Sequence, residues 1–312
     1  MTKNHIVLAL ISLFFGIFFC PSNTQAALLI QAKATGGANL AQNTYDFTDG
    51  TGGDFVAEAT HISPDSPYRD QGYAKASLTG AGVELKSKSY APDVYANSFA
   101  RIQDYFELDT MSGTSGATLD AVLNFNLTGT ITLSDIDGSN GTVWAELMAR
   151  QGSSTGTLLD YKVIRYDALW DSSSGMYVGS NDITWSYLFP VSPTQTGPSF
   201  NFVVPLSLDL DQMLADDSIY LSLYISTVGE LATVDFSNTL KTNQDNPFVI
   251  VSSPPGSSFT LATNSVYTTY GIGLFGELDG QEVSGPVPIP GAIWLLGSGF
   301  IGILGVRRKC KK

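Results

Sequence analysis

His61 is the only histidine after residue 5, so a general base near neutral pH would have to be built on it. A serine hydrolase would combine it with neighbours in the sequence, namely Ser63, Asp65, Ser66 and Asp70. Triad members usually lie far apart in the sequence, and the chain has no G-x-S-x-G nucleophile elbow. We therefore expect no catalytic residue here and interpret His61 as a surface-loop histidine.

Metal-ligating residues are scarce in the chain. One histidine and no cysteine between residues 27 and 286 cannot supply the nitrogen and sulfur ligands of a usual zinc or iron site. Asp135, Asp137 and Asn140 offer clustered oxygen ligands, which suit the flexible coordination of Ca²⁺. The spacing is not that of an EF-hand, and Asp and Asn also favour plain turns. We expect no cofactor, with Ca²⁺ at this turn as the one alternative.

Carboxylates stand close together at four points: Asp104 with Glu107, Asp135 with Asp137, Asp209 with Asp211, and Asp216 with Asp217. Glycoside hydrolysis needs two carboxylates at a set separation across a sugar cleft. Closeness along a strand does not provide that separation, and no local pattern singles out one pair. The sequence therefore does not predict an enzyme, and a secreted glycan hydrolase is a third-ranked interpretation.

Large aromatic residues are concentrated in one part of the chain: Trp144, Tyr161, Tyr166, Trp170, Tyr177, Trp185 and Tyr187. Rings exposed on a β-sheet can stack on sugars, whereas rings turned inward simply fill a core. Core packing is the commoner use of such residues. The sequence does not reveal which of these rings share a face, so a sugar-binding surface stays open as an alternative.

The elements that would position these side chains are strands. Residues 119–127 alternate with period two, which predicts that Leu119, Ala121, Leu123, Phe125 and Leu127 face a core. Asn140-Gly141 is a strong hairpin signal between this strand and a partner at 143–150. Further apolar runs predict strands at 28–32, 73–78, 83–85, 97–108, 130–133, 158–166, 176–178, 184–189, 200–208, 219–227, 233–236, 247–252 and 267–274.

Many short strands separated by turn signals predict an all-β fold, a β-sandwich or jelly-roll-like body. Pro205 inside an apolar run predicts an edge or bulged strand there. Residues 209–214 could form one helical turn, and residues 36–54 read as a long loop. Residues 278–286, polar and with Gly280, Gly285 and Pro286, read as a linker.

Charge is strongly partitioned along the chain. All 29 acidic residues but only ten of the sixteen basic ones fall between residues 27 and 286, which gives this part a net charge of −19. Such an acidic body disfavours binding of nucleic acid or anionic lipid through its overall field. The body also lacks cysteine, so no disulfide stabilises it, and a chain of this length must depend on its own core.

The N-terminus has the pattern of a secretory signal peptide. Lys3 and His5 precede an uncharged apolar run at 6–19, and small residues follow. Thr24 and Ala26 occupy the −3 and −1 positions, which predicts cleavage by signal peptidase after Ala26. Cys20 offers a rival lipoprotein signal, but the bulky Phe18 and Phe19 before it do not suit a lipobox.

The C-terminus is the most distinctive segment. Pro288 and Pro290 form a stiff extended entry, and the uncharged residues 291–306 follow. A helix over 291–306 spans about 24 Å, a little less than the hydrocarbon core of about 30 Å. A basic tail at 307–312 then acts as a stop-transfer signal that stays in the cytoplasm. The tail contains Arg307, Arg308, Lys309, Lys311 and Lys312.

This end resembles the PEP-CTERM sorting signal of Gram-negative bacteria, in its VPxP…WL-GSG variant. The residues that carry the resemblance are Val287, Pro288, Ile289, Pro290, Trp294, Leu295, Gly297, Ser298, Gly299, Gly302, Gly305, Arg307 and Arg308. One departure is Ile289, which stands where the name-giving motif has an acidic residue. Residues 232–240, with the stretch DFSNTL, look like a segment that recurs late in such proteins.

The resemblance implies a path for the protein: export, temporary anchoring in the inner membrane, processing by an exosortase at 287–290, and release to the cell surface or matrix. It also implies association with exopolysaccharide in a biofilm matrix. An ordinary single-pass membrane anchor is the alternative for residues 291–306. The expected organisation is a signal peptide at 1–26, a β-sandwich exported domain at 27–277, a linker at 278–286 and the sorting signal at 287–312.

On this basis we expect a structural or adhesive matrix protein. A carbohydrate-binding module, with or without calcium, is the main alternative, and no nucleic-acid partner is expected.

Overall fold

The computed structural model describes residues 29–36, 42–47, 55–62, 70–79, 82–181, 189–243, 245–263, 274–275, 278 and 280–284. Within these residues the chain is all-β, as the sequence predicts, and no α-helix occurs. The described part accordingly holds no helix long and apolar enough to cross a membrane. Residues 1–28 and 285–312, with both expected sorting segments, lie outside it.

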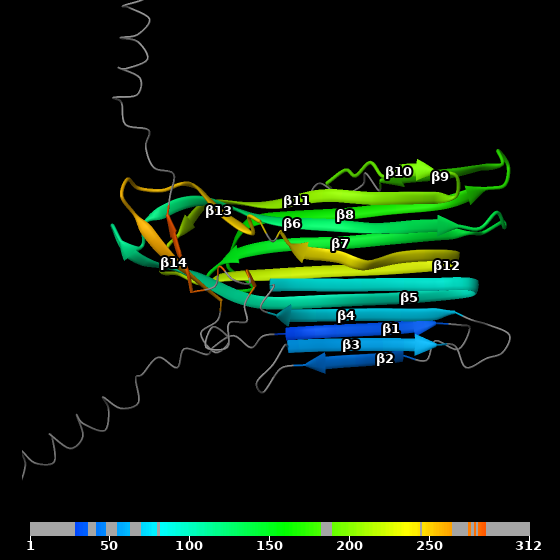
Figure 1. The fold of residues 1–312 in the computed structure, drawn as a ribbon, viewed down its shortest axis with the longest axis horizontal. Helices are drawn as coiled ribbons and strands as arrows, with labels where there is room; N and C mark the ends of the chain where they lie inside the picture. Colours follow the sequence, from blue (N-terminus) through cyan, green and yellow to red (C-terminus); the bar gives the residue numbers. More distant parts are fainter. Residues whose placement is uncertain are drawn as a thin grey trace, which may run out of the picture.

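The strands are β1 (Leu29–Gly36), β2 (Gln42–Phe47), β3 (Phe55–Ile62), β4 (Gln71–Thr79), β5 (Gly82–Ser112), β6 (Thr118–Leu133), β7 (Asn140–Gln151), β8 (Thr157–Asp171), β9 (Met176–Asn181), β10 (Thr194–Thr196), β11 (Ser199–Leu214), β12 (Ile219–Thr242), β13 (Phe248–Ser252), β14 (Ser258–Thr263) and β15 (Glu282–Ser284). All the pairings among them are antiparallel. They form one hydrogen-bonded network, elongated along the strand direction (Figure 1).

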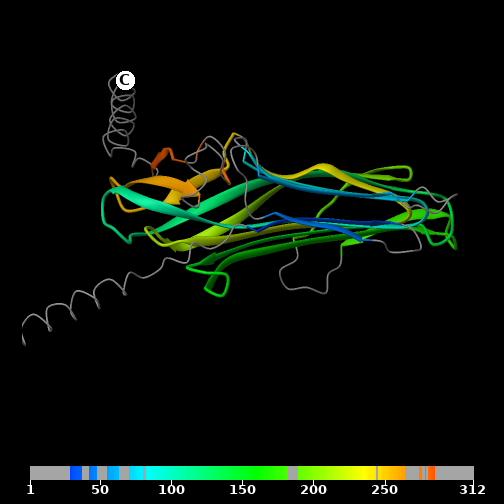
Figure 2. The same ribbon diagram turned by 90° about the horizontal axis from the view of Figure 1, so that it is seen from below.

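Two long strands fold this network into two facing layers, which Figure 2 shows edge-on. β5 and β12 pair with each other along almost their whole length, with a register shift between Glu230 and Ala232. Leu231 has a left-handed φ of 51° at this point. Both strands turn over together here, so the first half of each belongs to one layer and the second half to the other.

Layer 1 is built from β2, β1, residues 96–112 of β5, residues 219–230 of β12, β7, β8 and β9, in that order. Layer 2 is built from β3, β4, residues 82–91 of β5, residues 232–242 of β12, β6, β11 and β10. β13 extends layer 2 beside β6, and β14 with β15 extends layer 1 beside the end of β5.

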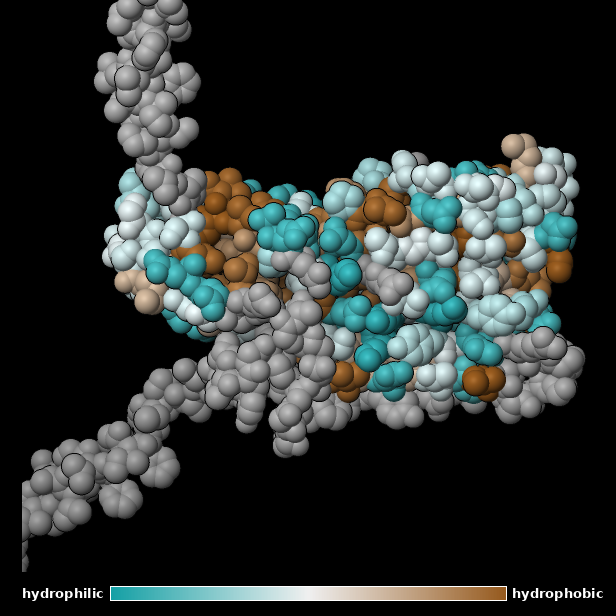
Figure 3. All heavy atoms as spheres, viewed as in Figure 1, coloured by the Kyte–Doolittle hydropathy of each residue, from teal (hydrophilic) through white to brown (hydrophobic). Residues whose placement is uncertain are grey.

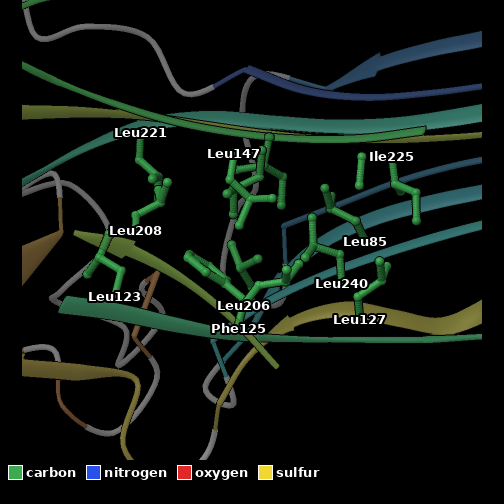
Figure 4. Close-up of a cluster of buried hydrophobic side chains, with 14 of the residues drawn as sticks. Leu85, Leu123, Phe125, Leu127, Leu147, Leu206, Leu208, Leu221, Ile225 and Leu240 are labelled. Atoms are coloured by element: carbon green, nitrogen blue, oxygen red, sulfur yellow. The ribbon is translucent and has the colours of Figure 1, made fainter. Parts of the chain in front are cut away.

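The core lies between the two layers (Figure 4). Leu147, Leu221 and Ile225 from layer 1 face a set from layer 2, all nearly inaccessible to solvent: Leu85, Leu123, Phe125, Leu127, Leu206, Leu208 and Leu240. The alternation predicted for residues 119–127 is confirmed, because every residue predicted to face inward there is buried.

Small residues fill the core near the turnover, where the layers approach each other closely. Ala32, Ala34, Ala74 and Ala76 are fully buried there. A Cβ atom added to Gly72 of β4 would lie 2.6 Å from the carbonyl oxygen of Thr35 and 2.8 Å from that of Asn97. Since both atoms belong to the backbone of the opposite layer, only glycine fits this position.

Several local predictions differ from the structure. Residues 209–214 continue β11 through a bulge and form no helical turn, because Gln212 adopts a left-handed φ of 56°. Residues 36–54, read as a loop, contain β2. The predicted hairpin between residues 119–133 and 143–150 is wrong, because β6 lies in layer 2, β7 lies in layer 1 and the two strands do not pair. Residues 134–139 connect the two layers, and Asn140 is the first residue of β7. Within the expected linker, residues 282–284 pair with β14.

Pro205 lies in a strand that is mostly at an edge, as the sequence predicts. β11 pairs with β6 along its length, while β10 covers its other side only at residues 199–201. The missing N–H of Pro205 therefore leaves no gap in the described ladder.

Candidate functional site

The outward surface of layer 1 gathers aromatic and arginine side chains, and we call it the aromatic–arginine face. Its members alternate along their strands with buried core residues. The face comprises Phe99, Arg101 and Tyr105 of β5, Tyr220 and Tyr224 of β12, Trp144, Glu146 and Arg150 of β7, and Tyr161 and Arg165 of β8. The register places these strands side by side, so the face is continuous.

Cross-strand pairing brings the guanidinium groups onto the rings. The Arg101 guanidinium carbon lies 5.2 Å from the ring centre of Tyr224, its partner in the β5–β12 register. The Arg165 carbon lies 5.7 Å from the ring centre of Trp144, its partner in the β7–β8 register. Such contacts are cation–π interactions, which hold the guanidinium over the ring.

Ring–ring contacts complete the face. The centres of Phe99 and Tyr224 are 5.6 Å apart, and those of Tyr105 and Tyr220 are 5.2 Å apart. Both pairs are tilted, an arrangement that aromatic pairs prefer. The rings thus support one another and are only partly accessible.

The hydroxyls of Tyr161, Tyr220 and Tyr224 stay protonated at neutral pH, because the pKa of each is raised. Burial raises the pKa of Tyr224 and of Tyr220 above the ordinary value. Burial also raises the pKa of Tyr161, and the charge of Glu146 with its hydrogen bond to the Tyr161 hydroxyl raises it further. The face therefore presents neutral phenols and positive guanidinium groups around the acidic side chain of Glu146.

Two of the three arginines on the face have no carboxylate within ion-pair distance in the described part of the chain. Arg150 donates to the carbonyl oxygen of Gly156 at 2.9 Å, and the Nε of Arg101 is buried without a hydrogen-bond partner in that part. Arg165 does have one, since its Nε lies 3.2 Å from Asp167 Oδ2.

The outward surface of layer 2 differs in kind. Lysines stand there in place of arginines. Lys75, Lys86 and Lys88 pair with Glu58, Glu84 and Asp235, whereas Lys241 has no ion pair among the described residues. Three of the four arginines between residues 27 and 286 therefore lie on the aromatic–arginine face, while these lysines lie on the other layer. Tyr, Trp and Arg are the residues enriched in binding hot spots.

The predicted aromatic cluster divides between core and surface. Trp144 and Tyr161 belong to the aromatic–arginine face. Tyr166 is buried in the core, with its ring centre 5.9 Å from Phe200 and 5.2 Å from Phe202. Trp170 and Tyr177 contact each other at 4.6 Å on the other side of β8 and β9. Trp185 and Tyr187 lie outside the described residues. Arg101, Arg150 and Arg165 are not among the site residues predicted from the sequence. Each one neighbours apolar residues of a predicted strand, and this was the signal that could have placed it on an outward face.

His61 does not lie on a surface loop, so that prediction was wrong. It sits in β3 opposite Gly72 and is 7% exposed. Asp70 is fully buried nearby in the chain, and its Oδ1 accepts hydrogen bonds from the backbone N–H groups of Asp93 and Val94 at the turnover of β5. Its geometry is that of a structural cap. Ser63, Asp65 and Ser66 lie outside the described residues.

One of the four carboxylate pairs, Asp104 with Glu107, separates in the structure. Asp104 is fully buried on the inner side of β5, whereas Glu107 is exposed on its outer side. Burial raises the pKa of Glu107, and the charges of Asp109, Asp217 and Asp216 add to the shift.

Asp216 serves to tie a loop. Its carboxylate accepts hydrogen bonds from Ser115 Oγ at 2.5 Å and from the N–H groups of Thr110 and Gly116 at 2.6 and 2.8 Å. The bond from the Ser115 hydroxyl, followed by those from the two N–H groups, lowers the pKa of Asp216 to about 2.

Hydrogen bonds of Ser139 and Asn140 organise the proposed calcium turn. Ser139 Oγ donates to the carbonyl oxygen of Leu231 at 2.8 Å, and the Asn140 amide donates to Gly138 and Glu230. Asp135 and Asp137 are exposed on the turn. Among the described residues, no group of three or more His, Cys, Asp or Glu side chains is placed to hold a metal ion.

A separate hydrophobic area lies at one end of the body. Val249 and Val251 of β13 are 39% and 53% exposed. Figure 3 shows hydrophobic residues gathered at this end of one broad face, while hydrophilic residues cover its middle. This area lies apart from the aromatic–arginine face, because β13 belongs to layer 2.

Comparison with known proteins found no match: no family model, no curated protein and no solved structure matches the chain.

Proposed function

We propose that the chain is an exported structural or adhesive protein of the cell surface or extracellular matrix, sorted by an exosortase-type system. The observation that supports this is the pair of end segments around an acidic all-β body. Signal peptidase acts after Ala26, and residues 291–306 anchor the chain briefly in the inner membrane. Processing within Val287, Pro288, Ile289 and Pro290 then releases the body.

The properties of the body are compatible with that role. A net charge of −19 between residues 27 and 286 keeps the exported part soluble. The long shared ladder of β5 and β12 connects both layers of the sandwich without any disulfide. Such a fold remains intact whether the surroundings are oxidising or reducing.

The test is to delete residues 287–312 in the native host and compare fractions. The intact chain is expected to pass transiently through the inner membrane and to accumulate outside it. The deletion variant is expected never to appear in the inner-membrane fraction. If both chains distribute alike between the fractions, the C-terminal segment is not a sorting signal.

A second function is favoured by the aromatic–arginine face. A flat surface with neutral phenols and guanidinium groups suits binding of a carbohydrate, so the body would act as a glycan-binding module within the matrix. Calcium assistance at Asp135, Asp137 and Asn140 is tested by chelation, which abolishes glycan binding only if an ion is required. Binding that survives chelation removes calcium from this account.

A further inference from the structure

We propose that the aromatic–arginine face binds an acidic polysaccharide, one whose sugars carry carboxylate or sulfate groups, through Arg101, Arg150 and Arg165. This inference rests on the proposed export, which places the body where such polymers occur, and it goes further by naming the surface and the charge class of the ligand.

The ring faces argue against a neutral sugar as the ligand. Stacking of a sugar requires an open ring face, but guanidinium groups lie over the rings of Tyr224 and Trp144. What these pairs present to a ligand is therefore a held guanidinium. Arginine recognises carboxylate, sulfate or phosphate through paired N–H donors, and a supporting ring orients the group without neutralising its charge.

Charge supports the same class of ligand. Arg101 and Arg150 have no carboxylate partner among the described residues, whereas Lys75, Lys86 and Lys88 of layer 2 are each paired with an acid. Arg101 and Arg150 thus place two positive charges, without ion-pair partners in the described part of the chain, on a body of net charge −19, on a face that also holds Glu146 and the Arg165–Asp167 ion pair. These two guanidinium groups would attract an anionic ligand to this face.

The spacing of the arginines favours a polymer over a small anion. Arg101 stands on β5 and Arg165 on β8, with β12 and β7 between them. Strands in a sheet lie about 4.8 Å apart, so the two positions are about 14 Å apart across the sheet. No single phosphate or sulfate can touch both, but a chain that lies across the strands meets one anionic group after another.

The hydroxyls between the arginines match the rest of such a ligand. Burial raises the pKa of Tyr220 and of Tyr224, so both hydroxyls stay protonated, while the Tyr161 hydroxyl is hydrogen-bonded to Glu146. Tyr224 is partly exposed and can donate a hydrogen bond to a sugar oxygen. An acidic protein surface would use the arginines but has less need of these phenols. We therefore assign the face to a hydroxyl-rich polyanion, with a second copy of this acidic chain as the competing occupant.

The experiment uses the full chain purified from its native host and three immobilised probes: polygalacturonate, dextran sulfate and neutral dextran. We expect binding to both polyanions, weakened by salt, and none to neutral dextran. The double variant R101Q/R150Q is expected to lose about tenfold or more in affinity, because charge-assisted hydrogen bonds are removed. The matched control is the double variant K75Q/K86Q, which makes the same charge change on layer 2 and should bind like the parent.

R101K is the second variant, which keeps the charge and the stem but lacks the planar fork. R101K keeps a positive charge beside the ring of Tyr224 but loses the paired N–H donors, so an intermediate affinity is expected. Equal weakening by R101Q/R150Q and K75Q/K86Q would overturn the assignment to this face, and so would binding of neutral dextran as strongly as polygalacturonate.

Two further outcomes separate this inference from the proposed function. If no probe binds and sedimentation shows a dimer that R101Q/R150Q dissociates, the occupant is a second copy and the glycan assignment fails. If the protein is recovered outside the inner membrane yet binds no probe and stays monomeric, export stands and the binding inference falls. If it binds but never leaves the inner membrane, the export proposal fails and the site remains.

Discussion

The hydroxyl oxygens of Ser87 and Ser98 lie 2.8 Å apart, although both residues belong to the single strand β5 and are eleven positions apart in the sequence. They meet because β5 folds over between them and each residue faces the core from a different layer. Thr227 of β12 joins them, with its Oγ1 3.0 Å from Ser87 and 3.1 Å from Ser98. This buried hydroxyl cluster connects the two layers at the turnover.

Substitution of Ser98 by alanine should destabilise the protein by about 1–3 kcal/mol, because buried partners lose a hydrogen bond in a site that water does not reach. Ser98 Oγ also donates to the carbonyl oxygen of Lys88 at 3.0 Å and is 1% exposed. Urea unfolding measures the change. Ser207 of β11, on the outer side of layer 2, is the control, and its alanine variant should stay within about 0.5 kcal/mol. If the alanine variants of Ser98 and Ser207 lost the same free energy of unfolding, the buried hydroxyl cluster would not stabilise the protein.

Substitution of Gly72 by alanine should cost about 1–3 kcal/mol or more, since the new methyl group meets backbone atoms of Thr35 and Asn97 that cannot move aside. Gly138 contrasts with Gly72. A methyl group at Gly138 would meet no neighbouring atom, so alanine there would be disfavoured only by the left-handed φ of 86°. Thermal unfolding of G72A should therefore reveal a steric cost. A G72A protein as stable as the parent would show that the layers are farther apart than described.

Substitution of Phe236 by alanine should cost about 3–5 kcal/mol. Phe236 is fully buried, with its ring centre 5.2 Å from that of Phe202, and it packs onto Gly129, where any Cβ would lie 2.4 Å from its ring. Phe236 belongs to the DFSNTL stretch, which forms a bulge of β12 between Phe236 and Leu240 and contributes Phe236 to the core. Chemical denaturation would measure the loss, with F99L on the outer face as a milder comparison. A cost below that of F99L would contradict this contribution.

Asp216 should make stability depend on pH in a narrow acid window. Its pKa is lowered from 3.8 to about 2 in the folded protein, chiefly by the Ser115 hydroxyl. A depressed folded pKa gives a contribution that is present above the unfolded value and is lost as the pH falls toward 2. D216N should therefore be less stable than the parent at pH 7, and the difference should shrink below pH 4. D211N is the control at an exposed position of β11. A D216N difference that is constant from pH 7 to pH 2 would exclude the ionised carboxylate as the cause.

Local pattern was enough to predict the all-β class and the inward residues of β6, because each strand of a sandwich that is wet on one side alternates with period two. The same logic failed for β5. Runs at 83–85 and 97–108 were read as separate strands, while Pro92 and the residues around it interrupt the alternation without ending the ladder. The turnover depends on pairing with β12, which lies more than a hundred residues later, and no local signal encodes it.

The candidate site was only half visible in the sequence for a similar reason. Trp144 and Tyr161 can be singled out in the sequence as aromatic residues. Their place beside Arg101 and Arg165 follows from the register of four strands, which no local pattern encodes. His61 was misread because a single histidine near prolines looks like a loop residue. Its burial follows from pairing of β3 with β4, where Gly72 leaves room for the opposite layer.

The central claim is that two end segments deliver the body beyond the inner membrane. The most direct measurement is the intact mass of the protein from its native host, with membrane and extracellular fractions kept apart. The account predicts an extracellular species that begins near Ala27 and ends near residues 288–290. A steady-state species in the inner membrane that still carries Arg307 to Lys312 would contradict it and would make the chain a tethered periplasmic domain.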